Sequence, residues 1–163
     1  MTLYRQSDVG HYFSRETAVS LELPFSWIEI GGKAGEVAYG YEIDEAERAA
    51  FDFQPQLVIK RFNVPAMSPN AATEFINDLI AVSQPEQLVH KQEDITIDGV
   101  AGRMAMLSYL LENSELRVRQ LQFFLPVGQT LFTITGLVAE KDAATFLPDM
   151  QTAVYSIRIL QGE

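Results

Sequence analysis

The sequence contains no cysteine in its 163 residues. Zinc–thiolate sites, iron–sulfur clusters, disulfide bonds and cysteine nucleophiles all require this side chain, so the chain forms none of them. A domain of this size buries roughly 70% of its unfolded surface and needs no cross-link to fold. The absence of cysteine therefore excludes a group of chemistries and leaves the redox compartment open.

Basic side chains are few: 12 lysines and arginines stand against 22 aspartates and glutamates, which gives a net charge of −10. Such a field repels a phosphate backbone or an anionic membrane surface. The charge therefore argues against nucleic acid as a partner and is typical of a soluble domain.

Long apolar runs are also absent. No stretch reaches the ~18 uncharged apolar residues of a membrane-spanning helix, so we expect no membrane insertion. The first residues lack the apolar core of a secretory signal. If Met1 is the native start, we expect a cytoplasmic protein, although a processed precursor would give the same sequence.

No catalytic or metal-binding motif is present. His11 and His90 are the two histidines, and His90 lies in a polar alternating stretch where a solvent-facing ring is the ordinary state. No serine lies in the G-x-S-x-G turn of a nucleophile elbow. We therefore assign no catalytic, cofactor-binding or metal-binding residue, and we expect neither enzymatic activity nor a cofactor.

Three segments resemble ligand loops only in part. Residues 31–36 (GGKAGE) lack the lysine and hydroxyl order of a phosphate-binding loop and indicate a β-turn. Residues 94–99 begin like a calcium loop, but Ala105 stands where that loop requires a glutamate. The acidic group at 42–47 could hold a cation weakly, and a solvated loop is the simpler interpretation.

The first half of the chain is predicted to form strands, because apolar and polar residues alternate between proline, glycine and acidic segments. These strands lie at 19–23, 27–30, 37–43 and 56–64. Residues 1–17 have weak periodicity, so we expect a loosely ordered lead-in there and a single domain over 18–163. The acidic segment 44–54 is either a helical turn or a mobile loop.

Two segments predict amphipathic helices. In 68–84, Ser68 can cap the first N–H groups, a proline follows it, and apolar residues recur at helical spacing. A second helix is expected over 142–157, where Pro148 either begins a new helical segment or kinks the helix. After it, 157–160 is a last turn or an edge strand.

Between the helices, 87–138 has a period of two and predicts a four-strand antiparallel meander. Asp98-Gly99 is its strongest hairpin signal. In the third strand apolar residues lie on both faces, so either both faces are covered or a bulge near Gln120 shifts the register.

The predicted order is strands, helix, meander, helix. Each helix must bury its apolar stripe, and the sheet is apolar on much of both faces. We therefore predict an α+β domain in which helices flank an antiparallel sheet of about six to seven strands.

Four local features accompany this order. They are LPFSW at 23–27, IDGVAG at 97–102, LFTITG at 131–136 and YSI at 155–157. With these features, residues 17–160 resemble the Mog1/PsbP-like fold, an α/β/α sandwich, and within it the DcrB-related, PsbP-like proteins.

That resemblance implies a binding scaffold. The proteins it brings together are photosystem II extrinsic subunits, a nuclear-import regulator that binds a small GTPase, and chaperones for type VI secretion effectors. It therefore implies a non-enzymatic protein-binding or assembly module, in its sharper form a chaperone-like adaptor whose concave apolar face shelters a hydrophobic helix. The photosynthetic role would require a lumenal targeting segment or a lipid-modified cysteine, and this sequence has neither.

A protein partner is expected on a sheet face or on the 44–54 segment. The alternative function is a small-molecule or lipid-binding protein with a pocket between sheet and helices. Aromatic and methionine side chains are the remaining surface candidates, most of which we expect in the core. They are Tyr39, Tyr41, Phe51, Phe53, Met104 and Met106. The sequence identifies no partner and leaves a homodimer open.

Overall fold

The computed structural model describes residues 9–160 of the chain. Within that range, strands and helices follow one another in an α+β order, as predicted. The elements are β1 (Val9–Ser14), β2 (Val19–Pro24), β3 (Trp27–Gly31), β4 (Glu36–Tyr41), η2 (Arg48–Ala50), β5 (Gln56–Asn63), α1 (Pro69–Ala81), β6 (Leu88–Ile97), β7 (Val100–Leu110), β8 (Arg117–Val127), β9 (Thr130–Ala139), η3 (Glu140–Asp142), α2 (Ala143–Tyr155) and β10 (Arg158–Ile159).

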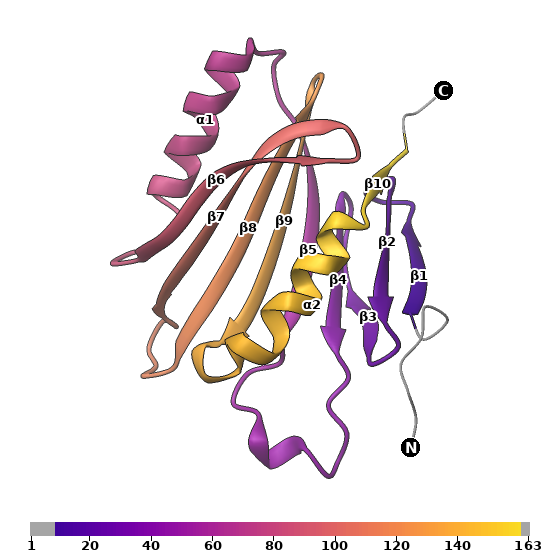
Figure 1. Ribbon diagram of the computed structural model, residues 1–163, viewed down its shortest axis with the longest axis vertical. Helices are drawn as coiled ribbons and strands as arrows, with labels where there is room; N and C mark the ends of the chain where they lie inside the picture. The colour runs from indigo at the N-terminus through magenta and orange to yellow at the C-terminus, as the bar shows by residue number, and fades with distance from the viewer. Residues whose placement is uncertain (1–8, 161–163) are drawn as a thin grey trace.

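The main layer is a seven-stranded antiparallel sheet with the order β3-β4-β5-β9-β8-β7-β6 (Figure 1). The predicted four-strand meander is confirmed as β6 to β9. Its last strand, β9, pairs with β5 along eight residues and so joins the meander to the first half of the chain.

Strand β8 has both of its faces covered. It pairs with β7 and β9 without a register shift, so there is no bulge at Gln120. Phe123 and Leu125 lie in the core that includes α2, whereas Phe124 packs with α1. Neighbouring residues of a strand point to opposite faces, so α1 and α2 lie on opposite sides of the sheet.

Helix α1 begins as predicted and ends earlier. The Ala71 N–H donates to the Ser68 side chain at 3.2 Å, which caps the first turn. The helix ends at Ala81 rather than at 84. The Gln87 side-chain amide then donates to the Ile80 carbonyl at 2.8 Å, satisfying one of the last carbonyls of the helix.

Helix α2 runs without interruption through Pro148, so this proline does not begin a second segment. It buries Phe146, Met150 and Val154 against the sheet and β2. Neither helix of the described region has the length and apolar character needed to cross a membrane.

A second, three-stranded sheet has the order β1-β2-β10. Its strand β1 corrects the expectation of a loose lead-in over 1–17: residues 9–14 pair with β2 from Val9↔Pro24 to Ser14↔Val19. The periodicity is weak because β1 is an edge strand with mostly exposed or half-buried residues. Residues 1–8 lie outside the described range. At the other edge, β10 confirms the edge-strand alternative for 157–160.

Candidate functional site

The two faces of the main sheet are covered unequally. Helix α2 and strand β2 pack against one of them, which we call the covered face. On the other side, α1 packs against Ala105, Leu107, Phe124 and Leu131, which belong to β7, β8 and the start of β9. Figure 1 shows α1 at the β6–β7 end of the sheet and α2 lying over its middle. In the described chain, α1 therefore leaves β3, β4, β5 and most of β9 bare on its side.

The strand register shows which side chains lie on this bare area, which we call the open face. Directly paired residues of antiparallel strands point to the same side of the sheet. Val58 pairs with Ala38 and Thr135, and Phe62 pairs with Leu131, which contacts α1. The open face comprises Ile28, Ile30, Glu36, Ala38, Gly40, Gln56, Val58, Lys60, Phe62, Thr133, Thr135 and Leu137.

The open face is mainly apolar and partly exposed to solvent. Phe62 is 45% exposed, Ile30 40% and Ile28 36%. Two charged side chains, Glu36 and Lys60, lie directly opposite each other on β4 and β5 and separate Phe62 from Ile28 and Ile30. The open face is therefore a mainly apolar surface crossed by one charged pair, and α1 stands beside it.

Gly40 allows Ile30 to lie across the sheet. A Cβ atom at Gly40 would be 3.0 Å from the Cδ1 atom of Ile30 and 2.9 Å from the side-chain nitrogen of Gln54. Without that Cβ, the Ile30 side chain extends over β4 and adds its apolar surface to the open face.

A row of neutral polar side chains separates the open face from α1. The Gln120 amide donates to Gln122 Oε1 at 3.0 Å and to Ser83 Oγ at 3.3 Å, while its oxygen accepts from the Tyr109 hydroxyl at 2.8 Å. Burial raises the pKa of Tyr109, which keeps its hydroxyl protonated as a donor. These hydrogen bonds fix the border of the open face.

The aromatic and methionine candidates of the sequence lie elsewhere. Tyr39 and Met104 are fully buried. Burial, with smaller contributions from Glu29 and Tyr12, raises the pKa of Tyr39 to about 12. Tyr39 is therefore neutral at physiological pH and cannot act as a base. The others, Tyr41, Phe51, Phe53 and Met106, are half-buried.

Segment 44–54 is held in place by specific contacts and includes the helical turn η2. The Phe51 ring lies 5.5 Å from the ring of Tyr41 and 5.9 Å from that of Phe146. Lys141 Nζ lies 3.0 Å from Asp52 Oδ2. The Glu47 carboxylate accepts from the Tyr41 hydroxyl at 2.9 Å. Of the sequence alternatives, the helical turn is the correct one.

Neither histidine lies in a reactive arrangement. His90 Nε2 is 2.7 Å from Ser108 Oγ. Ser108 is only 1% exposed and lies within a strand, so its oxygen cannot reach a substrate. His11 is exposed and lies 3.7 Å from Glu22. Across residues 9–160, no group of three acidic or histidine side chains is placed to hold a metal ion.

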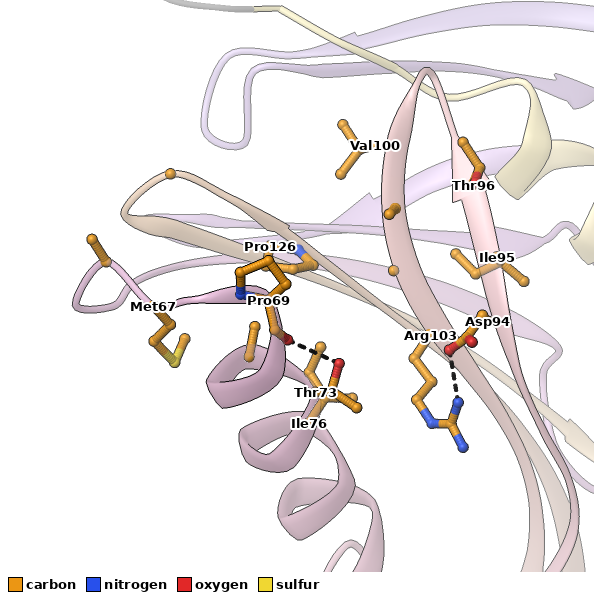
Figure 2. A pocket seen from close by; sticks show the side chains of 15 residues that line it. Met67, Pro69, Thr73, Ile76, Asp94, Ile95, Thr96, Val100, Arg103 and Pro126 are labelled. Atoms are coloured by element: carbon orange, nitrogen blue, oxygen red, sulfur yellow. Dashed lines mark hydrogen bonds and ion pairs between the residues drawn. The ribbon is translucent and has the colours of Figure 1, made fainter.

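A separate groove lies between α1 and the β6–β7 hairpin. It has a volume of about 820 Å³ (Figure 2). We call it the α1 groove. The alternative function predicted from the sequence requires a pocket between the sheet and the helices, and the α1 groove has that location. No sequence motif indicates the residues that line it.

Ile28, Ile30 and Phe62 are not among the residues that the sequence singles out. The sequence feature that could have indicated them is the presence of apolar residues on both sides of β3. Trp27 points into the core, and the two isoleucines point the other way. Only the arrangement of helices shows that this second side stays bare.

Among the comparisons with known proteins, only solved structures match this chain. No protein-family model matches the sequence, and no curated protein matches it significantly. CyanoP, the cyanobacterial PsbP of Synechocystis, has a TM-score of 0.58 and 17% identity, over 94% of this chain and 93% of its own. The Ran-binding protein Mog1p of Saccharomyces cerevisiae has a TM-score of 0.60 and 9% identity, over 93% of this chain and 95% of its own.

A structure from Bacteroides thetaiotaomicron has a TM-score of 0.64 and 12% identity over 94% of this chain, which spans 49% of that longer chain. At such identities a similarity shows the fold alone. The protein has a Mog1/PsbP-like fold, as predicted. The assignment to the DcrB-related proteins within that fold stays a prediction.

Proposed function

We propose that this protein is a non-enzymatic binding module that holds an apolar segment of a protein partner on the open face. The observation that carries the proposal is the apolar surface that Ile28 and Ile30, each at least 36% exposed, form with Ala38, Val58 and Leu137 on the open face. Apolar surface in water is unfavourable, and contiguous patches of this kind commonly mark partner surfaces.

The dimensions of the open face suit a helix. Neighbouring strands are about 4.8 Å apart, so four strands span roughly 15 Å. An α-helix with its side chains is about 10–12 Å in diameter. Helix α1 stands along one border and would limit sideways movement of a bound helix. Thr135, which is partly exposed, offers a hydroxyl group to polar atoms of such a helix.

Charge and fold also favour a protein partner. A net charge of −10 disfavours nucleic acid and anionic lipid surfaces. Mog1p, one of the solved structures with this fold, is a Ran-binding protein. The chaperone-like adaptor is the finer form of this proposal, in which the bound segment is a hydrophobic helix kept from aggregation until it is delivered.

The test compares the double variant Ile28→Asp/Ile30→Asp with a matched control, Leu110→Asp. Leu110 is 53% exposed at the end of β7, outside the open face. We expect the wild type and the control to capture the same protein from a native lysate and the double variant to lose it. A synthetic peptide with the most apolar helix of that protein should then bind the wild type in calorimetry.

Two results would overturn the proposal. One is equal capture by the wild type and the double variant, with circular dichroism showing that both are folded. The other is a captured protein whose apolar peptide does not bind, because the open face would then not be the contact surface.

A further inference from the structure

The α1 groove is built like a site for an organic ligand and is separate from the open face. Figure 2 shows its three walls: α1 with Pro69, Thr73 and Ile76, the β6–β7 hairpin with Ile95 and Val100, and the end of β8 with Pro126. Its volume of about 820 Å³ lies in the range of small-molecule sites, which is roughly 300–1,000 Å³. The walls are mostly apolar, so the main part of a fitting ligand is apolar as well.

One cationic group lines this apolar groove. Arg103 Nη1 donates to Asp94 Oδ1 at 2.8 Å. Arg103 Nη2 makes only a long contact of 3.5 Å with Gln92 Oε1, and Nε is buried without a protein partner in the described chain. A guanidinium group can donate through all three nitrogens, so about half of this donor capacity is unused.

The other polar side chains that line the groove are Thr73, Asp94 and Thr96. Thr73 donates its hydroxyl to the Pro69 carbonyl at 3.0 Å. Asp94 is the one carboxylate that lines the groove, and Arg103 neutralises it. The first turn of α1, whose dipole favours negative charge, borders the groove as well. The groove therefore favours an acceptor group at the Arg103 side and apolar atoms elsewhere.

We propose that the α1 groove binds an amphipathic monocarboxylate, with its aliphatic part along α1 and its carboxylate on the guanidinium group of Arg103. A carboxylate matches two parallel N–H donors of a guanidinium group. Because Nε is buried, the guanidinium group must turn to offer two such donors to the ligand, and this turn disturbs its contact with Asp94. The Asp94 side chain is 88% exposed, and ion pairs of such exposed groups contribute little to stability.

The test uses decanoate as the probe and calorimetry with the full chain. Wild-type protein should bind decanoate and should bind decanol, which lacks the carboxylate, at least tenfold more weakly. Arg103→Gln should weaken decanoate binding at least tenfold. Arg117→Gln, which removes an arginine at the exposed start of β8, is the matched control and should leave binding unchanged.

A second variant keeps the proposal testable if Arg103→Gln does not fold. Thr73 is exposed and lines the groove, so Thr73→Trp should fill the groove without disturbing the core. We expect this variant to lose decanoate binding.

Three results would each overturn the proposal. They are no binding of decanoate to the wild type, equal binding of decanol, and unchanged decanoate binding in a folded Arg103→Gln or Thr73→Trp variant. Ile28→Asp/Ile30→Asp should bind decanoate like the wild type, because the two sites do not share residues. The outcome for the groove is thus independent of the outcome for the open face.

Discussion

The covered face and the open face belong to the same seven-stranded sheet, yet their apolar side chains are exposed to very different extents. On the covered face, Leu57, Phe123 and Ile134 are at most 1% exposed beneath α2 and β2. On the open face, Ile28, Ile30 and Phe62 are at least 36% exposed. Both faces are rich in apolar side chains, so the alternation of residues does not distinguish them. The position of the helices distinguishes them. The open face is exposed because no helix packs on it, and not because its residues differ in kind from those of the covered face.

The largest expected effect is a difference in stability between the two faces. Phe123→Ala removes a ring that is 0% exposed and should lower the free energy of unfolding by about 3–5 kcal/mol. Phe62→Ala on the open face should lower it by about 1 kcal/mol or less. Urea denaturation followed by circular dichroism measures both. Equal losses would show that the open face is packed against something in the free protein and would break the comparison.

An intermediate effect is expected on the free energy of unfolding at alkaline pH, through Tyr39 on the covered face. The pKa of Tyr39 is raised from 10.0 to about 12, so the folded state disfavours its ionised form. A raised pKa gives stability that is complete below the unfolded pKa and is lost as pH rises through the folded one. A shift of this size corresponds to roughly 3 kcal/mol, lost between about pH 10 and pH 12.

Tyr39→Phe isolates that contribution, because other tyrosines and lysines also titrate in this range. The Tyr39 hydroxyl has no hydrogen-bond partner among the described residues, so its removal leaves no group unpaired. We expect the variant to lose less stability than the wild type from pH 10 to pH 12. We measure the free energy of unfolding of both proteins from pH 10 to pH 12. If both lose the same amount, Tyr39 is not the group responsible.

The smallest expected effect compares one glycine on each face. A Cβ at Gly136 would lie 2.9 Å from the sulfur of Met150, which is 1% exposed under α2. Gly136→Ala should therefore cost about 1–3 kcal/mol through overpacking. At Gly40 the neighbouring Ile30 side chain can move into solvent, so Gly40→Ala should cost less. Thermal unfolding of both variants measures the difference, and a larger loss at Gly40 would contradict it.

Several elements could be predicted from the sequence because their causes are local. The start of α1 follows from the Ser68 cap and the proline after it. The β6–β7 turn follows from Asp98-Gly99, which adopt φ values of +51° and +77°, as a tight hairpin turn requires. The meander and the fold class follow from the periodicity of two and the two apolar helix stripes.

Other features could not be predicted because their causes lie far away in the chain. Strand β1 is stabilised by pairing with β2 rather than by an apolar pattern of its own. The absence of a bulge at Gln120 depends on both helices covering β8 from opposite sides. Arg103 faces the α1 groove because β7 pairs with β6 in one register, and a shift of one residue would turn it to the other face.

The sequence by itself determined an α+β domain without cysteine chemistry, with a strongly acidic charge and with a sheet that is apolar on much of both faces. Only the tertiary structure decided which of those faces stays bare and where Arg103 meets an apolar groove. The physical reason is that periodicity acts between neighbours, whereas coverage depends on where α1 packs after the β5–β9 pairing has brought the two halves of the chain together.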